Sequence, residues 1–544
     1  MDRLEPGRAP VYEMLEQYRV KGNISYHVPG HKNGDAYRGQ ESAGFLREVM
    51  RYDVTEITGT DDLHHPEGVI QEAQELAADC FGAEESFFLV GGSTAGNLAL
   101  ILTVCPEPGM TLILQRNVHK SVIHGLMLAG VRAVFVEPQM DWHSGLMVTP
   151  AVQTIQNALA AYPEAAAVLV TMPNYYGMGS DLAPLAQACH DSGVPLLVDE
   201  AHGAHYGQHP ALPAGALVCG ADGVVQSTHK MLSALTMGAM LHVQGPWLDR
   251  ALLRQRLAMV QSSSPSYPVM ASLDLARRLV HSQRAGAFTA GLAAVDVLRR
   301  GLASLPRYGL LQPAEPLQPG CGAAGTGAAA DMPPQSVAAY STQDPFKAVI
   351  YDAAGVLGGF ELQRRLEAKG IVPEMSDDRH VVLAFSLGSK AEDTGLLLAA
   401  LREIAEETAD ATVNLHEDTT RQGFSTECLP AQSAAGVVPD SAKNSTWNNF
   451  TNDIISSPVL FSMKPVNPLE TESIGLEYST GRMSAEMVIP YPPGIPLLYP
   501  GEEISEDICN RLIGLSQGGA KFQACADPVL QQILVYNIKK GGDA

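Results

Sequence analysis

The regular alternation of apolar runs and helical patterns between residues 86 and 243 is the feature that most constrains the fold. Strand-like runs lie at 87–90, 111–115, 132–136, 166–171, 195–198 and 238–243, and helical patterns lie at 98–104, 120–129, 150–161 and 181–192. Strands that alternate with helices favour a parallel sheet covered on both faces. In such sheets ligands bind beyond the carboxyl ends of the strands. The sequence therefore predicts an α/β domain with its site at one edge of the sheet.

Polar clusters follow four of the predicted strands. They are Ser93-Thr94, residues 117–121 around His119, residues 199–202, and residues 227–230. The first cluster lies in the glycine-rich run 91–97 between a strand and a helix, where backbone N–H groups and hydroxyls suit a phosphate. The run lacks the spacings of dinucleotide and nucleoside triphosphate loops. A plain tight turn is the alternative.

Lys230 follows directly after a β-branched run that ends in Ser227-Thr228-His229. Partial burial there lowers the pKa of a lysine and frees its neutral amine to attack a carbonyl. Asp199 ends the preceding strand, where a buried carboxylate needs a partner. Taken singly, a surface lysine and a structural aspartate are the ordinary interpretations. A phosphate cradle, an aspartate and a lysine in this order fit pyridoxal phosphate (PLP), with His119 placed to stack on the ring.

Composition narrows the classes of partner. Lys+Arg 36 against Asp+Glu 59 give a net charge of −23, which disfavours nucleic acid and anionic membrane surfaces. Eight scattered cysteines without a CxxC pair indicate reduced thiols, and the polar stretch 1–6 has no apolar signal segment. We therefore expect a cytoplasmic protein without a metal site or a membrane span.

The pattern along the chain predicts six segments. They are an N-terminal arm and loop (1–50), a PLP-binding large domain (51–303), a low-complexity linker (304–345), a small α+β domain (346–408), a disordered insertion (409–470) and a C-terminal segment that completes the small domain (471–544). Helical spacing predicts helices over 10–21 and 69–81.

Several blocks of the chain resemble the bacterial Orn/Lys/Arg decarboxylases in their short form without the wing domain. These are PLP enzymes of the aminotransferase-like fold (fold type I), with a mostly parallel sheet in the large domain and a smaller α+β C-terminal domain. The blocks are 27–32, 91–97, 117–121, 199–205, 227–230 and 490–496. The family more often has Gln at the position of Met237.

The resemblance implies roles for individual residues. Lys230 would be the Schiff-base lysine, Asp199 would face the pyridine nitrogen, and His119 and Ala201 would flank the ring. The remaining cofactor-binding candidates are Ser93, Thr94, His202, Ser227 and His229, with His229 also taking part in proton transfer. The substrate's distal cation needs an acidic recess, for which the candidates are Glu486, Asp61 and Asp62.

The implied reaction is decarboxylation of arginine, lysine or ornithine to agmatine, cadaverine or putrescine and CO₂. A homodimer or higher even oligomer is expected, with the loop 262–268 contributing across the interface. An aminotransferase or another PLP lyase on the same fold stays open, because Arg364, Arg365 and Arg379 are available to bind a carboxylate. A non-catalytic PLP- or polyamine-binding regulator is a third alternative, although such proteins usually lose the lysine or the aspartate.

Overall fold

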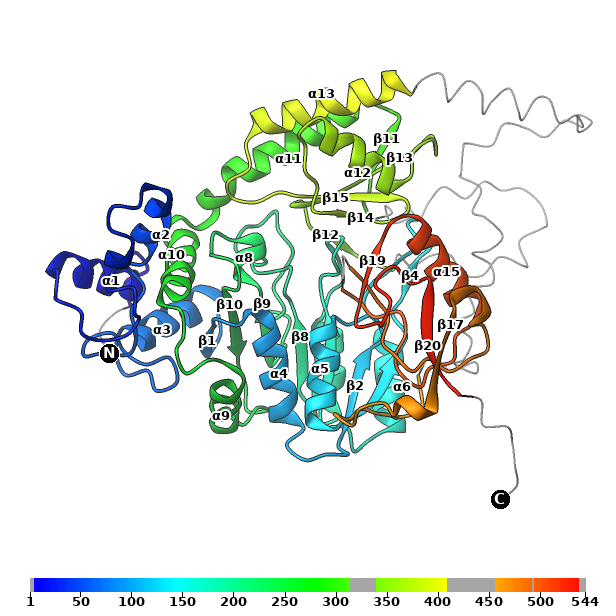
Figure 1. The fold of residues 1–544 in the computed structure, drawn as a ribbon, viewed down its shortest axis with the longest axis horizontal. Helices are drawn as coiled ribbons and strands as arrows, with labels where there is room; N and C mark the ends of the chain where they lie inside the picture. The colour runs from blue at the N-terminus through cyan, green and yellow to red at the C-terminus, as the bar shows by residue number, and fades with distance from the viewer. Residues whose placement is uncertain (1–3, 314–338, 409–454, 492–493, 538–544) are drawn as a thin grey trace, which may run out of the picture.

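The large domain is built on an eight-stranded sheet with the strand order β1-β10-β9-β8-β6-β2-β3-β16 (Figure 1). The structure is a computed structural model that describes residues 4–313, 339–408, 455–491 and 494–537. The five central strands are parallel: β9 (Gly223–Gln226), β8 (Leu196–Asp199), β6 (Val168–Thr171), β2 (Thr111–Gln115) and β3 (Arg132–Val136). β10 (Ala239–Val243) runs antiparallel between β9 and β1 (Glu85–Leu89). The predicted mostly parallel sheet is confirmed.

Helices cover both faces of this sheet because successive strand side chains point to opposite sides. Leu112 and Leu114 pack with α4 (Gly92–Val104), α5 (Lys120–Ala129) and α9 (Arg250–Val260). Ile113 points into the core on the other face. The helices of that core are α3 (Val69–Phe81), α6 (Val152–Ala161), α7 (Ala183–Asp191) and α10 (Tyr267–Gln283).

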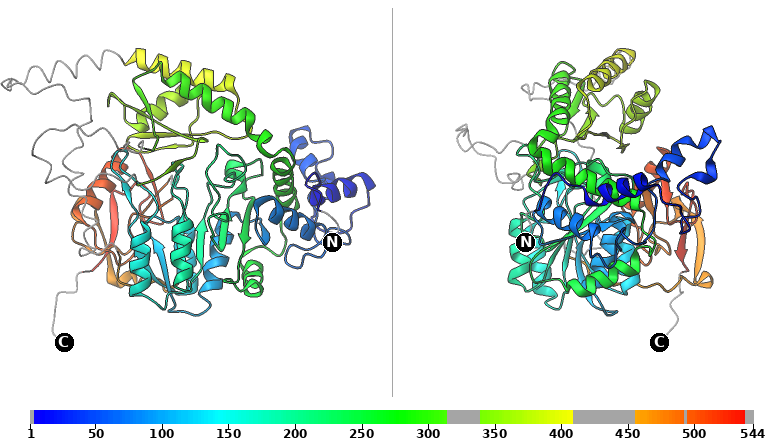
Figure 2. Two further views of the ribbon diagram at one scale, coloured as in Figure 1. Left: turned by 180° about the vertical axis from the view of Figure 1, so that it is seen from behind. Right: turned by 90° about the vertical axis from the view of Figure 1, so that its left-hand side faces the viewer.

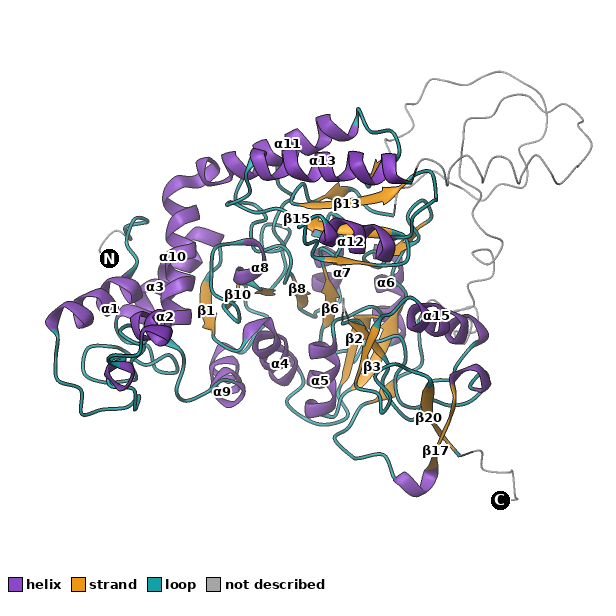
Figure 3. Ribbon diagram, turned by 45° about the horizontal axis from the view of Figure 1, so that its top comes forward, coloured by secondary structure: helices purple, strands orange, loops and turns teal. Residues whose placement is uncertain are grey.

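The small domain is a four-stranded antiparallel sheet in the order β11-β13-β15-β14. Its elements are β11 (Tyr308–Leu310), β13 (Lys347–Asp352), β14 (Met375–Ser376), β15 (His380–Ala384), α11 (Thr289–Leu302), α12 (Gly359–Ala368) and α13 (Ala391–Glu407). Figure 3 shows α11 and α13 side by side over this sheet. β11 falls within the predicted linker, because three residues are too few to show a strand periodicity. Residues 314–338 of that linker lie outside the described residues.

The C-terminal segment differs from its predicted place. β17 (Thr471–Gly475) pairs with β20 (Gln532–Tyr536), β18 (Ile489–Tyr491) pairs with β19 (Lys521–Gln523), and with α15 (Glu506–Gln517) they enclose a separate apolar core. None of these strands joins the small-domain sheet. Instead Arg116, at the end of β2, pairs with Glu502 at 2.8 Å and lies 3.9 Å from the ring centroid of Tyr499. The segment therefore packs on the large domain, where the buried guanidinium of Arg116 binds it.

Part of the predicted insertion 409–470 also has a defined place. β16 (Val459–Leu460) pairs with β3 at the edge of the large sheet. Residues 409–454 lie outside the described residues.

At its N-terminus the chain is held against the large domain. The predicted helix appears as α1 (Pro10–Lys21), which packs on α10 and α3. The fully buried Arg277 donates to the carbonyls of Pro6 and Arg8, and Asp274 accepts from the backbone N–H of Val11 at 2.9 Å. The N-terminal helices and the C-terminal segment lie at opposite ends of the large domain (Figures 1 and 2).

Short elements complete the described parts of the chain. They are α2 (Gly44–Val49), α8 (Thr228–Met231), β4 (Met140–Asp141), β5 (Leu146–Met147), β7 (Met178–Gly179), β12 (Thr342–Gln343), η1 (Asp35–Tyr37), η2 (Glu41–Ala43), η3 (Arg284–Phe288), η5 (Pro468–Glu470) and η6 (Leu476–Tyr478). β7 and β12 pair and so link the large domain to the start of the small one. Within the described ranges, no helix combines the length and the apolar character that crossing a membrane requires.

Candidate active site

Side chains from the carboxyl ends of β9, β8, β6 and β2 meet in one small pocket. Because these strands are parallel neighbours, their ends lie at the same edge of the sheet. The pocket is lined by Ser93, Gln115, Asn117, His119, Thr171, Asn174, Tyr175, Asp199, Ala201, His202, Lys230 and Ile495. Six of the predicted site residues are thus brought together: Ser93, His119, Asp199, Ala201, His202 and Lys230.

Lys230 lies on the short helix α8, one turn past the end of β9. Its Nζ is 3.1 Å from Nε2 of His202 and 5.5 Å from the ring centroid of Tyr175. Burial lowers the pKa of Lys230 to about 8, while the Asp199 charge opposes this shift. The sequence predicted a lysine partly removed from solvent, and the burial of Lys230 agrees with that prediction.

His202 offers a buried donor that no described residue satisfies. The ammonium of Lys230 can only donate, so Nε2 of His202 accepts and Nδ1 carries the hydrogen. Nδ1 is buried and has no hydrogen-bond partner among the described residues. Burial also lowers the pKa of His202 well below its usual value, so the ring is neutral. An oxygen atom of a bound ligand would satisfy this donor.

We expect the reaction of Lys230 with the PLP aldehyde to accelerate with pH and to level off above about pH 8. Only the neutral amine attacks, and a pKa lowered to about 8 gives roughly a fivefold larger neutral fraction at pH 8 than at pH 7. The measurement is the rate at which the cofactor's absorbance band develops after PLP is mixed with cofactor-free protein. A rate that keeps rising through pH 10 would identify an ordinary, solvated lysine.

Asp199 is the last residue of β8 and is buried. Its Oδ2 accepts from Nδ2 of Asn97 at 2.9 Å, and its Oδ1 accepts from the backbone N–H of Ala201 at 3.2 Å. Burial raises the pKa of Asp199, and the Lys230 charge and the Asn97 hydrogen bond oppose that rise. The carboxylate is therefore held in a fixed orientation at the base of the pocket.

Asn97 is a site residue that the sequence interpretation left without a role. Its Nδ2 also donates to Oγ of Ser121 at 3.0 Å, and that hydroxyl lies 2.9 Å from Nδ1 of His119. One amide thus connects Asp199 with His119. The sequence offered one signal for this role: Asn97 follows Ser93 by one helical turn and is the only residue of α4 with an amide side chain.

Replacing Asn97 by alanine should lower the free energy of unfolding by about 1–3 kcal/mol, because a buried oxygen of Asp199 loses its donor. Denaturant unfolding measures the loss. Asn157→Ala serves as the matched control, since Asn157 is exposed and bonded only to Gln153 on the same helix. Equal midpoints for the two variants would show that the Asn97 bond does not stabilise the buried carboxylate.

His119 forms a neutral wall of the pocket. The backbone N–H of Ser121 donates to its Nδ1 at 3.2 Å, which leaves the hydrogen on Nε2. Burial, with the charges of Lys230 and Lys120, lowers the pKa of His119 to about 3. Gly494 packs on the ring: a Cβ at this glycine, whose φ is +87°, would lie 3.3 Å from Cδ2 and Nε2 of His119.

Gly494 and Ile495 of the C-terminal segment therefore lie over the site. Ile495 lines the pocket, and the backbone N–H of Lys120 donates to the carbonyl of Gly494 at 3.2 Å. Pro492 and Pro493 lie outside the described residues.

The glycine-rich turn before α4 is suited to a phosphate. No side chain caps the N-terminus of α4, and the hydroxyl of Ser227 donates to Oγ of Ser93 at 2.9 Å. Thr94 is exposed on the first turn of α4. The backbone N–H of Gly92 donates to the carbonyl of Met237 at 2.9 Å, so the position that departs from the family pattern borders this cradle.

His229 lies beside this cradle, outside the pocket lining. Its Nδ1 donates to the carbonyl of Gly238 at 3.0 Å, which leaves Nε2 as an acceptor. Burial lowers the pKa of His229.

The prediction that Asp61, Asp62 and Glu486 bind the distal cation of the substrate is not supported, because none of them lines this pocket. The carboxylate of Asp61 accepts from backbone N–H groups at the start of α3, among them that of Ile70 at 2.8 Å, and that of Asp62 accepts from His64. Glu486 is buried and accepts from the backbone N–H groups of Ala526 and Leu534. Backbone donors therefore occupy these side chains in this structure.

The three candidate arginines for a substrate carboxylate also lie elsewhere. Arg364 and Arg365 pair with Glu361 on α12. Arg379 donates to the carbonyl of His143 and lies 4.9 Å from the ring centroid of Tyr351.

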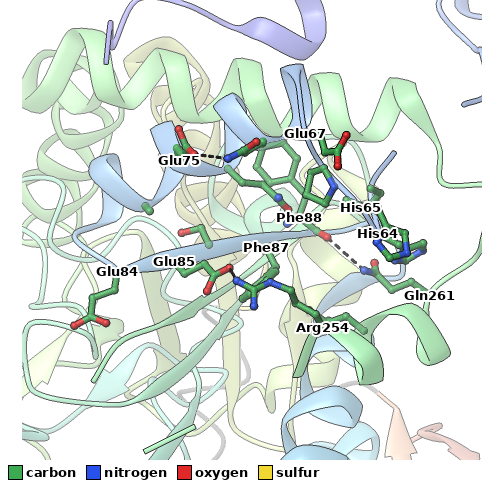
Figure 4. Close-up of a pocket in the computed structure, with 17 residues that line it drawn as sticks. His64, His65, Glu67, Glu75, Glu84, Glu85, Phe87, Phe88, Arg254 and Gln261 are labelled. Carbon is green, nitrogen blue, oxygen red and sulfur yellow. Dashed lines mark hydrogen bonds and ion pairs between the residues drawn. The ribbon is translucent and has the colours of Figure 1, made fainter. Parts of the chain in front are cut away.

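A cleft of about 510 Å³ lies on the free edge of β1 between α3 and α9 (Figure 4). Two of its polar side chains accept hydrogen bonds from the edge strand. The backbone N–H of Phe88 donates to Gln74 at 2.9 Å, and that of Val90 donates to Gln261 at 2.9 Å. Glu85 pairs with Arg254. The cleft contains no lysine, and among the described residues no group of three or more His, Cys, Asp or Glu side chains could hold a metal ion.

Known proteins match this chain along nearly all of its length. The family model Orn/Lys/Arg decarboxylase, major domain, matches residues 9–393, and the model Orn/Lys/Arg decarboxylase, C-terminal domain, matches residues 462–522. The protein YaaO of Bacillus subtilis (strain 168), described as uncharacterized, is 36% identical over 97% of this chain and 98% of its own length. The arginine decarboxylase of the same organism is 31% identical over 98% of both chains.

More distant relatives share the fold. The lysine decarboxylase LdcA of Pseudomonas aeruginosa is 26% identical over 91% of this chain and 74% of its own length. The solved structure of the constitutive lysine decarboxylase of Escherichia coli superposes with a TM-score of 0.73 at 22% identity, covering 97% of this chain and 82% of that one. Together with the mostly parallel sheet, this superposition confirms the predicted aminotransferase-like fold (fold type I). From the two family models and the full-length match at 31% identity, we conclude that this chain is an enzyme of the Orn/Lys/Arg decarboxylase family of lyases.

Proposed function

We propose that this enzyme decarboxylates a basic amino acid with the help of PLP, and that its substrate is arginine, which yields agmatine and CO₂. The observation that carries the proposal is the meeting of Lys230, Asp199 and His119 in one pocket beside the uncapped start of α4. Arginine is favoured over lysine and ornithine because relatives named arginine decarboxylase match nearly full length at 28–31% identity. The relative named lysine decarboxylase LdcA matches at 26% over 74% of its length.

The residues present fit the cofactor. Lys230 is the amine that would bind its aldehyde, and Asp199 would face its ring nitrogen, with His119 and Ala201 on the two ring faces. The hydroxyls of Ser93, Thr94 and Ser227 and the N–H groups of α4 would hold its phosphate. The unsatisfied Nδ1–H of His202 is a donor that a cofactor oxygen would satisfy.

When bound, PLP supplies an electron sink for the electron pair that CO₂ leaves at Cα. As a carboxylate accepting from Asn97 and Ala201, Asp199 would favour a proton on the ring nitrogen. His119 is neutral and so adds no charge to the face that it covers. Lys230 would hold the cofactor by its aldehyde and, as an ammonium, would be the donor that returns a proton to Cα. Among the described residues no side chain or backbone group bonds Nε2 of His229, so this nitrogen would be able to accept a proton near the site.

The test is CO₂ release by the PLP-loaded protein with arginine, lysine and ornithine in parallel, together with an assay for keto acids. We expect CO₂ from all or some of these substrates, with the highest kcat/KM for arginine. Keto acid formation without CO₂ would identify an aminotransferase, and no turnover with a normal cofactor band would favour the regulator. The aminotransferase is disfavoured because Arg364, Arg365 and Arg379 do not line the pocket.

We further propose a cytoplasmic homodimer. Large apolar side chains are exposed on the loop after α1 and on α2, with Ile24 86%, Tyr26 94% and Phe45 78% accessible, which favours a protein partner. The six cysteines within the described residues are free thiols, as in a reducing compartment.

A dimer predicts a solution mass twice the chain mass of 57.9 kDa by light scattering. Tyr26→Glu combined with Phe45→Glu should shift the protein toward the monomer, because two charges enter the exposed apolar patch. Leu396→Glu, on the exposed side of α13, is the control. A monomeric wild-type protein would contradict the proposal.

A further inference from the structure

The small domain places one buried cation next to the active site. Lys347 is the first residue of β13 and is 2% exposed. No hydrogen bond or ion pair holds its ammonium within the described parts of the chain. Burying an unpaired ammonium is costly, so a cation in this position needs an anionic partner.

The backbone fixes Lys347 against the turn that carries Tyr175. A Cβ at Gly177, whose φ is +77°, would lie 2.5 Å from Cβ of Lys347, so only glycine allows this approach. The backbone N–H of Asp344 donates to the carbonyl of Gly177 at 2.8 Å and locks the contact. Tyr175 itself lines the pocket, with its ring 4.3 Å from the ring of His202, centroid to centroid.

Lys347 lies within electrostatic reach of the reacting amine. Its charge lowers the pKa of Lys230 and of His202. Burial lowers the pKa of Lys347, and the charges of Glu374 and Asp344 oppose that shift. Asp344 is already paired with the fully buried His205 at 3.0 Å, and Glu374 is exposed. Neither forms an ion pair with Lys347, so its positive charge remains available to a ligand.

We propose that Lys347 binds the α-carboxylate of the substrate amino acid. The inference rests on the proposed function, since it needs an amino acid whose amine meets the cofactor at Lys230. One carbon separates an α-amine from its α-carboxylate, and Lys347 packs against the turn whose Tyr175 lines the pocket together with Lys230, so its ammonium is placed to meet that group. In this role Lys347 replaces Arg364, Arg365 and Arg379, the candidates that the sequence offered for a substrate carboxylate and that do not line the pocket.

A lysine suits a decarboxylase at this position better than an arginine. Arginine grips a carboxylate with two parallel hydrogen bonds, whereas lysine presents a point charge. The carboxylate loses its charge as it leaves as CO₂, so tight bidentate binding would stabilise the ground state more than the transition state. Lys347 can orient the carboxylate with a smaller penalty of this kind.

The test compares two ligands that bind without turnover. Des-amino arginine keeps the carboxylate and guanidinium but has no α-amine, and agmatine has no carboxylate. Calorimetry on the PLP-loaded protein should show that Lys347→Met weakens des-amino arginine about tenfold or more and changes agmatine less than about twofold. Lys347→Arg, which keeps the charge, should restore most of the affinity. Des-amino lysine and cadaverine are measured in parallel, so that the result does not depend on which side chain the enzyme prefers.

Structural effects are separated by a matched control. Lys369→Met removes a lysine that pairs with Glu403 and Glu407 at 2.8 Å on the outer face of the small domain, and it should change neither ligand. Melting temperature and bound PLP are recorded for every variant, and Lys347→Gln replaces Lys347→Met if the latter does not fold.

Equal weakening of both ligands in Lys347→Met, or no weakening of either, would overturn the proposal. A wild-type protein that binds the amines but neither des-amino acid would also overturn it. The ligands bind without turnover. An absence of decarboxylation would therefore refute the proposed function, whereas the binding measurements would still test the role of Lys347.

Discussion

Lys230→Ala is expected to lower kcat by at least about a thousandfold, because the amine that would carry the cofactor and return a proton is removed. Within the described residues the Lys230 side chain forms one hydrogen bond, from Nζ to His202, so the fold should remain. The measurement is CO₂ release, with the absorbance band of the bound cofactor as a second readout. Decarboxylation within tenfold of the wild type would refute the assignment of Lys230.

Lys369→Ala is the control for this variant. It removes a lysine from the surface of the small domain, far from the strand ends, and should leave kcat unchanged.

Asp199→Asn should lower kcat by about 10²–10⁴-fold with little change in shape, because it removes the buried negative charge that would hold a proton on the ring nitrogen. It should also move the pH midpoint of PLP incorporation below about 8. The sign follows from the coupling: the Asp199 charge raises the pKa of Lys230, so its removal lowers that pKa further. A midpoint that rises, or a kcat that is unaffected, would contradict this role.

Asp222→Asn is the matched control for Asp199→Asn. Asp222 is likewise a buried carboxylate of the large domain, accepting from the backbone N–H of Leu196 at 2.8 Å and pairing with His190. It lies at the amino end of β9, away from the pocket. We expect this variant to lose stability while its kcat per bound PLP stays the same.

The framework of the large domain could be predicted from the sequence because its strands and helices carry strong periodicity. The predicted strand 111–115 and helix 120–129 agree with β2 and α5 to the residue. Elements of two or three residues, such as β11 and β16, could not be predicted, because such short strands depend on a pairing partner distant in sequence. The place of the C-terminal segment depends on Arg116, whose partners Glu502 and Tyr499 are likewise distant from it in sequence.

The same distinction holds for the site. The places of Asp199, at the end of β8, and Lys230, one turn beyond β9, could be predicted because topology alone brings the ends of parallel strands together. Asn97 and Tyr175 could not, because their roles depend on side-chain direction inside a helix and in a turn. The carboxylates of Asp61 and Glu486 looked available for a ligand, but nearby backbone N–H groups bind them, a competition that residue type does not show.

The most direct test of the central claim is to reduce the PLP-loaded protein with borohydride, digest it and locate the cofactor by mass spectrometry. The structure predicts the added mass on the peptide that contains Lys230, and on no other lysine peptide. Attachment at a different lysine, or no attachment in protein that shows the absorbance band, would contradict it.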